Sequence, residues 1–184
     1  FASFYEAMDS TRHIVTLKPT AVELVDKTMI ELSRDIPMFR KTIDQFVRGT
    51  PDALLLVEFA GEDHQRLLLD LKHLEELMAD YGFRSRMTAI VDPTQQRALW
   101  EVRKAGLNIM MSMKGDGKPI SFIEDCAVPL EHLADYTARL TEVFSKHGTT
   151  GTWYAHASEG CLHVRPVLNM KDSKDVRKMR AIRS

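Results

Sequence analysis

Two histidines stand seven positions apart near the end of the chain, in the stretch YAHASEGCLHVRP (154–166). Imidazole nitrogens are common ligands of divalent metals, and a bound ion can act as a Lewis acid. In a fully extended strand, seven residues would separate the two rings by roughly 23 Å. A hairpin that turns at Glu159 and Gly160 would instead place His156 directly opposite His163, with Cβ atoms about 5 Å apart. The stretch therefore predicts a pair of histidines that meet in space.

Alternation of side chains along this predicted hairpin gives it two unlike faces. Leu162 and Val164 would point into the core. The opposite face would carry groups that can do chemistry: Tyr154, His156, Ser158, Cys161, His163 and Arg165. An arginine on that face could hold a carboxylate through two hydrogen bonds. Histidines on an exposed hairpin are also often ordinary surface residues, so the spacing alone leaves both interpretations open.

Composition limits the classes of protein to which the chain can belong. The 184 residues are 44% hydrophobic and 28% charged, which is enough apolar material for one large domain or two small ones. A net charge of −1 gives no field that would recruit nucleic acid, so we expect no nucleic-acid partner. Two cysteines indicate a reducing compartment, and we expect a cytoplasmic protein. The longest apolar run, 53–57, is far shorter than the ~20 residues of a membrane span, although peripheral contact of a full-length protein with the inner membrane stays open.

Periodicity of apolar residues predicts the elements that must position this hairpin. Helical spacing predicts helices at 21–33, 38–47, 62–81, 94–111 and 130–148. Alternating or continuous apolar runs predict strands at 12–17, 52–61, 86–92, 120–129, 152–158 and 161–168. Because the chain ends in two adjacent strands, we expect an α+β fold. Our architecture is two ferredoxin-like halves, 1–85 and 86–184, that share an antiparallel sheet with helices packed on one face.

Three segments, in order, resemble FAD-linked oxidases of the vanillyl-alcohol oxidase type, a group that includes the flavin-containing chain of glycolate oxidase, D-lactate dehydrogenase and D-2-hydroxyglutarate dehydrogenase. ALWEVRKAG (98–106) resembles the family's Leu-Trp-x-x-Arg segment, and FIEDCAVPLEHL (122–133) its Glu-Asp-x-x-Val-Pro-x-x-x-Leu segment. HASEGCLH (156–163) resembles the His-x-Gly-Asp-Gly-Asn-x-His stretch of the family's C-terminal cap domain. The variant LHVRPVLNMK (162–171) looks closest to long bacterial members that also carry an iron–sulfur region.

The resemblance implies a function for each matched residue. The chain would be the substrate-side cap domain of a flavin-dependent D-2-hydroxy-acid dehydrogenase, which oxidises the hydroxy acid to the 2-oxo acid with FAD as hydride acceptor. His156 and His163 match histidines that bind a divalent metal such as zinc or manganese, and Arg103 matches the arginine that binds the substrate carboxylate. Glu159 and Cys161 fall in the part of the motif that lies near the flavin in relatives. A 4Fe-4S cluster is implied for another domain of the full-length protein.

The sequence also departs from the family pattern. Cys161 stands where the family has asparagine, so an amide near flavin and substrate is missing. Nothing in 1–184 resembles a phosphate cradle, and we therefore expect FAD to be bound mainly by a separate domain of the same full-length chain. The isolated fragment is expected to be colourless and inactive. Glu124 and Asp125 are adjacent in a predicted strand, where they would point to opposite faces, so one of them could reach the site or cap a loop, and a purely structural role is equally open.

A second hypothesis, from a different class, remains at this point. The chain would be a stand-alone ferredoxin-like module that binds a small ligand or a metal and has no redox activity. The sequence does not name the hydroxy acid, the electron acceptor or the oligomeric state.

Overall fold

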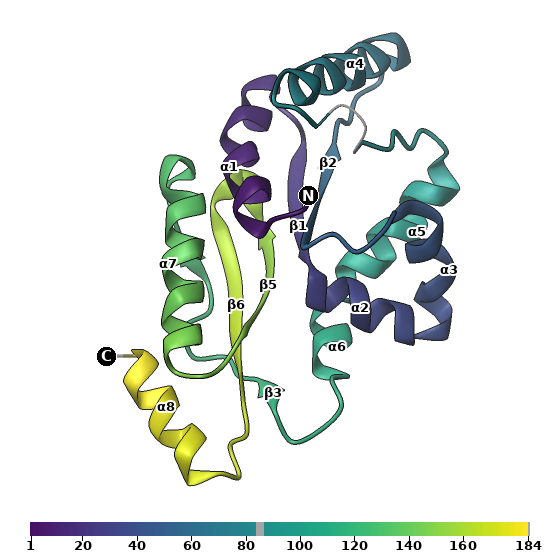
Figure 1. The fold of residues 1–184 in the computed structure, drawn as a ribbon. Coiled ribbons are helices and arrows are strands. Elements are labelled where there is room, and N and C mark those ends of the chain that lie inside the picture. Colours follow the sequence, from purple (N-terminus) through teal and green to yellow (C-terminus); the bar gives the residue numbers. More distant parts are fainter. Residues whose placement is uncertain (84–86, 184) are drawn as a thin grey trace.

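The computed structural model describes residues 1–83 and 87–183, and helices pack on a six-stranded sheet (Figure 1). The α-helices are α1 (Phe4–Ile14), α2 (Lys27–Asp35), α3 (Pro37–Phe46), α4 (His64–Asp80), α5 (Pro93–Lys104), α6 (Gly106–Met111), α7 (Leu133–Lys146) and α8 (Ser173–Arg183). The strands are β1 (Ala21–Asp26), β2 (Ala53–Glu58), β3 (Lys118–Pro119), β4 (Cys126–Ala127), β5 (Gly151–His156) and β6 (Cys161–Leu168). Short 3-10 turns are η1 (Val15–Leu17), η3 (Leu130–His132) and η4 (Ala157–Glu159).

Every strand pair in the sheet is antiparallel. The strand order is β2-β1-β5-β6-β3, and β4 pairs separately with β6. The pair β1–β2 comes from the first half of the sequence and the hairpin β5–β6 from the second, so the join between β1 and β5 brings the two halves together. The α+β class, with an antiparallel sheet and helices packed on it, is confirmed.

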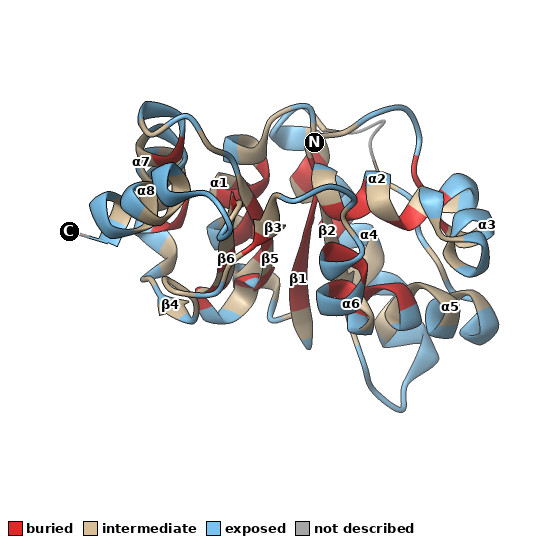
Figure 2. Ribbon diagram, turned by 90° about the horizontal axis from the view of Figure 1, so that it is seen from below, coloured by how far each residue is buried: buried red, intermediate tan, exposed pale blue. Residues whose placement is uncertain are grey.

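Helices α1, α4 and α7 cover one face of this sheet, which we call the apolar face. Side chains of Leu24, Ala155, Leu162 and Val164 are fully buried there, against a helix layer that includes Phe144. Figure 2 shows the buried residues on the strands and on the helix sides that face them, with exposed residues on the outer sides. Burial of this layer supplies most of the hydrophobic stabilisation available to the domain.

A second group of helices, α2, α3, α5 and α6, packs against the other side of the sheet near β1 and β2. Val25 is buried in this second cluster together with Met29, Ile43 and Ile109. Tyr154 packs at its margin. The remainder of this side, over β5, β6 and the neighbouring part of β1, carries polar and ionisable residues. We call this surface the polar face; its residues are Glu23, Tyr154, His156, Cys161, His163 and Arg165. Helices therefore lie on both sides of the sheet, but they flank the polar face rather than bury it completely.

Several predicted elements match the structure closely. Helices were expected at 38–47, 62–81 and 130–148, and α3, α4 and α7 lie there. Strands were expected at 52–61, 152–158 and 161–168, and β2, β5 and β6 lie there. These segments combine clear periodicity with turn-forming residues at their ends, which explains why the pattern was sufficient.

The predicted strand at 12–17 is wrong, because α1 occupies Phe4–Ile14. Ser3 and Glu6 form a capping box that starts this helix, and Ala7, Thr11 and Ile14 are buried along one of its sides. The β-branched residues at 14–16 suggested a strand, but Ile14 ends α1, and Val15 and Thr16 form the 3-10 turn η1 that follows it.

The predicted helix at 21–33 is also wrong, since β1 fills its first six residues and α2 its remainder. Residues 22–26 are all buried, as expected for a strand in the middle of a sheet. Asp26, not Thr20, caps the following helix through a 2.8 Å hydrogen bond from Met29 N–H to Oδ1. The helical spacing of Val22, Val25 and Met29 arose by coincidence across this junction.

The predicted helix at 94–111 is interrupted, because α5 ends at Lys104 and α6 starts at Gly106. A Cβ atom on Gly106 would lie 3.0 Å from Cε of Met29, so a larger residue there would require the end of the Met29 side chain to move. The predicted strand at 120–129 is reduced to the two residues of β4. The predicted strand at 86–92 is not formed within 87–92, and its first residue lies outside the described residues.

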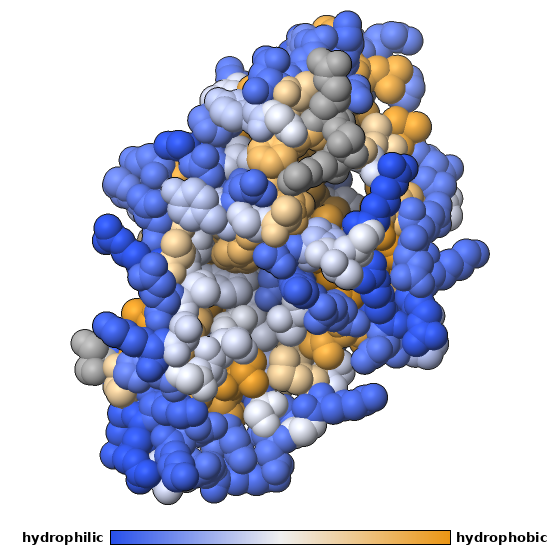
Figure 3. Space-filling model, in the orientation of Figure 1, coloured by the Kyte–Doolittle hydropathy of each residue, from blue (hydrophilic) through white to orange (hydrophobic). Residues whose placement is uncertain are grey.

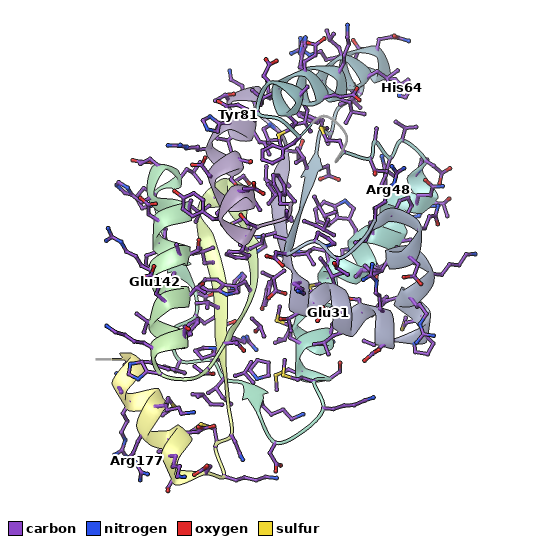
Figure 4. The ribbon with its side chains drawn as sticks, in the orientation of Figure 1. Glu31, Arg48, His64, Tyr81, Glu142 and Arg177 are labelled. Atoms are coloured by element: carbon purple, nitrogen blue, oxygen red, sulfur yellow. The ribbon has the colours of Figure 1, made fainter. Side chains whose placement is uncertain are left out.

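A groove of about 750 Å³ lies between β2, α4 and the segment 87–91, and none of the predicted site residues line it. Figure 3 shows hydrophobic side chains at the surface in this upper part of the molecule. Figure 4 marks α4 by its first residue, His64, and by Tyr81 just beyond its end. In the described ranges, 1–83 and 87–183, no helix is both long and apolar enough to cross a membrane.

Candidate functional site

The β5–β6 hairpin is paired in a register two residues away from the predicted one. His156 lies opposite Cys161, and His163 lies opposite Tyr154, so the expected direct pairing of the two histidines is wrong. The chain turns through η4 and Gly160 because Ala157 is drawn into the apolar core, where it is fully buried. Gly160 has a φ of 64°, and a Cβ there would come within 2.0 Å of the Val128 carbonyl oxygen.

The two histidines still come together, because a shift of two residues keeps both on the same face of the hairpin. Their ring centroids are 5.3 Å apart and their planes are nearly perpendicular, at 83°. The ring of Tyr154 stacks on that of His163 with centroids 4.6 Å apart. Leu162 and Val164 point to the apolar face as expected. The structure thus brings the predicted pair into contact diagonally across the hairpin.

Glu23 of β1 joins the hairpin to α5, and the sequence analysis did not identify it. Its Oε1 lies 2.8 Å from His156 Nδ1, and its Oε2 accepts a hydrogen bond of 2.5 Å from Nη2 of Arg103. Only 7% of Glu23 is exposed. A buried carboxylate needs compensation by charge or hydrogen bonds. Glu23 receives it from two residues that the sequence had independently assigned to the site.

Arg103 is therefore held in place before any ligand arrives. Its guanidinium donates to Glu23 and, over 3.3 Å, to the carbonyl oxygen of Ala155. The guanidinium carbon lies 5.1 Å from the centroid of the Tyr154 ring, within range of a cation–π contact. Its Nε is buried without a hydrogen-bond partner among the described residues. Arg103 thus retains one buried donor that no described residue uses.

Arg165 and Glu124 form a second ion pair on the polar face. Nε of Arg165 donates to Glu124 Oε1 over 2.7 Å, and Nη2 contacts the same oxygen. Both side chains are more than four-fifths buried. Arg165, predicted to bind substrate, therefore already has a carboxylate partner. The expectation that Glu124 and Asp125 point to opposite faces of a strand is wrong, because 124–125 is a loop and both carboxylates reach the polar face.

Asp125 is the neighbour that approaches His163. Its φ of 60° lies in the left-handed region, which turns its carboxylate toward the hairpin. Oδ1 comes within 2.8 Å of His163 Nδ1. The distance would suit a hydrogen bond but the angle does not, and the buried Nδ1 is left without a hydrogen-bond partner in the described part of the chain. The two histidines therefore differ: His156 is hydrogen-bonded to its carboxylate, and His163 is not.

Glu159 and Cys161, predicted near the flavin, lie at the turn of the hairpin. Glu159 is exposed in η4, and Cys161 begins β6 on the polar face. Burial, and then the carboxylate of Asp125, raise the pKa of the Cys161 thiol. Cys126, the other cysteine, packs against the apolar core instead. Neither side chain carries positive charge, so neither offers a phosphate-binding group, and their contact with a flavin stays a prediction.

The histidine pair fits a divalent metal. Two imidazoles on one tetrahedral zinc ion would have ring centroids roughly 5 Å apart, close to the observed 5.3 Å. Metal-binding histidines characteristically donate their second N–H to a carboxylate, which fixes the free nitrogen toward the ion. Glu23 provides this arrangement for His156. The Nε2 atoms of both rings make no hydrogen bond with the described residues, so both are available as ligands.

Glu23 was missed in the sequence, and of the adjacent pair Glu124 and Asp125 only one was expected to be able to reach the site. Glu23 had one detectable signal, a single acidic residue within the apolar run AVELVD. Such a residue in a buried strand requires a partner. No local signal places Glu124 and Asp125 beside the hairpin, because their positions depend on a loop between β3 and β4.

Comparisons with known proteins find similarity along almost the whole chain. The family model for FAD linked oxidases, C-terminal domain, matches residues 1–183. D-2-hydroxyglutarate dehydrogenase of Escherichia coli (strain K12) is 31% identical over 186 residues, which is 94% of this chain and 18% of the relative. The enzyme of the same name from Pantoea ananatis is 30% identical and covers 97% of the chain, and that of Haemophilus influenzae is 26% identical. The chain spans about a fifth of the length of these relatives.

Proposed function

The chain belongs to the family of FAD linked oxidases, C-terminal domain, and on that premise we propose that it forms the substrate-side wall of the active site in a flavin-dependent D-2-hydroxy-acid dehydrogenase. The reaction would be oxidation of a CH–OH group to a 2-oxo acid. D-2-hydroxyglutarate is our first candidate substrate, because the similar proteins from three bacteria are named as its dehydrogenases. D-lactate and glycolate are the alternatives within the same class.

The observation that carries this proposal is the position of Glu23 between His156 and Arg103. A single buried carboxylate contacts both, at 2.8 Å and 2.5 Å. An enzyme needs its metal ligand and its anion-binding group fixed relative to each other, so that little reorganisation is required when substrate binds. Glu23 of β1 brings together Arg103 of α5 and His156 of β5, although the three residues are far apart in sequence.

Each residue of the polar face then has a defined task. Glu23 accepts the Nδ1 proton of His156 and so leaves Nε2 directed to a ligand. His156 and His163 would hold a divalent ion such as zinc or manganese by these nitrogens. Arg103, whose Nε is unused, would bind the α-carboxylate of the substrate, and Arg165 would add positive charge beside it. When bound, the ion would acidify the α-hydroxyl and the flavin would accept the hydride.

The remaining parts of the enzyme would come from the full-length protein. We propose that FAD is bound mainly by a domain outside this chain, with Glu159 and Cys161 as the nearest contribution of the hairpin. Membership in an FAD-linked family argues against a stand-alone module without redox activity. The chain alone is expected to be colourless and inactive.

An iron–sulfur cluster in another domain and the electron acceptor stay predictions about the full-length protein. Both cysteines are free thiols, which agrees with a cytoplasmic location.

The first experiment is substrate profiling of the full-length protein with an artificial electron acceptor. Turnover is expected with D-2-hydroxy acids and is expected to be highest with D-2-hydroxyglutarate. Turnover with D-lactate or glycolate alone would correct the substrate while leaving the reaction class in place. Absence of turnover with all three acids, in protein that contains flavin, would contradict the proposal.

The second experiment removes the imidazole pair in the same protein. The double change His156→Ala with His163→Ala is expected to lower bound metal and turnover together, by about 10-fold or more, as for the loss of groups that bind or orient a metal. The matched control is His73→Ala with His132→Ala, since both of these histidines are exposed and neither belongs to the polar face. Unchanged metal content and turnover in the first variant would remove the proposed site.

A further inference from the structure

We propose that Asp125, Cys161 and His163 form a zinc-binding site of their own, on the Nδ1 side of His163. This site uses Nδ1 of His163, the nitrogen beside Asp125, and does not involve His156. Because a neutral imidazole has one unprotonated nitrogen, His163 can bind an ion here or in the imidazole pair, but not in both at once. The site is thus distinct from the imidazole pair. It therefore does not rest on the proposed dehydrogenase function. The ion would be bound by one carboxylate oxygen, one thiolate sulfur and one imidazole nitrogen.

The three ligand atoms already lie close together. One ligand atom from each of the three residues is within 4.8 Å of the others. In a tetrahedral zinc site, such atoms would be about 3.3–3.6 Å apart. Asp125 Oδ1 and His163 Nδ1, now 2.8 Å apart, would separate by about 0.5 Å on binding. Asp125, the most exposed of the three side chains, can supply that movement because it belongs to a loop.

The state of His163 Nδ1 points to a ligand at this position. The atom is buried and makes no hydrogen bond with the described residues, although Asp125 Oδ1 is 2.8 Å away. A buried polar atom without a partner is costly, and native structures rarely tolerate one without a reason. A nitrogen and a carboxylate oxygen that are close but misaligned for a hydrogen bond are arranged as two ligands of one ion would be.

The donor set suits zinc better than magnesium or calcium. Zinc accepts sulfur, nitrogen and oxygen ligands in one tetrahedral shell, whereas the hard cations prefer oxygen alone. Binding would convert the Cys161 thiol to a thiolate, with its proton released to solvent as the sulfur–zinc bond forms. No oxidant or reductant is involved. The site gives a role to the cysteine that stands in place of the family's asparagine.

Backbone conformation favours the same assignment. Asp125 adopts a left-handed φ of 60°, which is uncommon for a residue other than glycine and is tolerated best by Asp and Asn. The next two residues pair with β6, with Ala127 opposite Cys161. This pairing fixes the loop immediately beside the thiol, so that Asp125, just before β4, lies next to Cys161 and His163 of β6.

The test is zinc protection of Cys161 from alkylation in the metal-depleted full-length protein. Iodoacetamide labelling is measured with and without excess Zn²⁺, and the labelled peptides are quantified by mass spectrometry. Zinc is expected to slow labelling of Cys161 by about tenfold or more, because the metal-bound thiolate is shielded from the reagent. Cys126 serves as internal control, since it lies on the apolar side of the same strand ladder and its labelling should not change.

Three variants separate this site from the imidazole pair. Asp125→Asn, which keeps the left-handed conformation, and His163→Gln are each expected to abolish the protection. His156→Ala is expected to retain it. The proposal is overturned if zinc leaves Cys161 labelling unchanged, or if His156→Ala removes protection while Asp125→Asn keeps it. The latter result would place the ion on the imidazole pair alone. Loss of dehydrogenase activity has no bearing on any of these outcomes.

Discussion

Strand β1 carries two buried acidic residues, Glu23 on the polar face and Asp26 on the apolar face, and their surroundings differ. Glu23 contacts the guanidinium of Arg103 and the ring of His156. Asp26 accepts hydrogen bonds from backbone N–H groups, those of Met29 at 2.8 Å and Trp153 at 2.9 Å. Burial raises the pKa of Asp26 to about 7, even though these two hydrogen bonds oppose the shift.

The difference shows how one strand can serve both structure and chemistry. Asp26 links the start of α2 to β5 and needs no charge to do so, because a carboxyl group caps a helix as a hydrogen-bond acceptor. Glu23 is instead paired with the guanidinium of Arg103 and the imidazole of His156, the groups proposed to bind substrate and metal. The apolar face therefore stabilises the fold, whereas the polar face holds ionisable groups in fixed positions at some cost in stability.

The largest expected effect follows from breaking the network around Glu23. Glu23→Gln would leave the buried guanidinium of Arg103 without its carboxylate, and the free energy of unfolding is expected to fall by about 3–5 kcal/mol. Replacing both partners, as Glu23→Leu with Arg103→Met, is expected to recover most of this loss, because neither charge is then buried alone. Denaturant unfolding of the 184-residue chain measures both. A double variant as unstable as the single one would show that the ion pair itself supplies the stability.

A pH effect is expected from Asp26 on the apolar face. Its folded-state pKa of about 7 lies above the ordinary value of 3.8, so its contribution is fully present below about pH 4 and is lost as the pH rises through 7. The shift corresponds to at most about 4 kcal/mol. The difference in unfolding free energy between the wild-type chain and Asp26→Asn should therefore decrease from about pH 4 to about pH 8. A difference that is constant with pH would show that Asp26 ionises normally when buried.

Leu162→Ala tests the apolar face without touching the polar one. Leu162 is fully buried and adjacent to Cys161 and His163, whose side chains point the other way. The truncation is expected to lower the free energy of unfolding by about 3 kcal/mol through lost burial and a cavity. Turnover per folded molecule of the full-length protein should stay near the wild-type value. A loss of turnover as large as that of the histidine variants would mean that the two faces are not independent.

The smallest effect is expected from Glu124→Gln. This change removes the carboxylate that neutralises Arg165 and leaves the arginine free to attract an anionic substrate. The added positive charge is expected to strengthen binding of the hydroxy acid by up to about 1 kcal/mol, so KM should fall up to about fivefold with little change in kcat. Steady-state kinetics of the full-length protein give both constants. An increase in KM would instead show that Glu124 positions Arg165 for substrate.

Much of the fold could be predicted because its elements are marked by their own residues. The strands of the β5–β6 hairpin and the helix α7 have clear periodicity and turn residues at their ends. The junction between β1 and α2 was missed, since Val22, Val25 and Met29 have helical spacing although a strand ends between them. Local spacing could not reveal that Asp26 stops one element and starts the next.

The candidate site was predictable in part for a similar reason. Alternation correctly placed His156, His163 and Arg165 on one face, because the side-chain period of a strand survives a register shift of two residues. The exact pairing was wrong, since it depended on burial of Ala157, which is a tertiary effect. Glu23 and Asp125 reach the site through strand pairing and a loop, and neither is determined by neighbouring residues in sequence.

The most direct test of the account is the turnover of the full-length protein that carries Glu23→Leu with Arg103→Met. This double variant removes the network that holds His156 and Arg103 while retaining a stable fold, so the loss of activity is separated from unfolding. We predict that kcat/KM for D-2-hydroxyglutarate falls by about 100-fold or more, as for the loss of a positioned ligand and its anion-binding partner. The control change Glu76→Gln, at the exposed ion pair with Lys72 on α4, should leave it unchanged. Wild-type kcat/KM in the double variant would contradict the claim that the polar face is the substrate-binding wall.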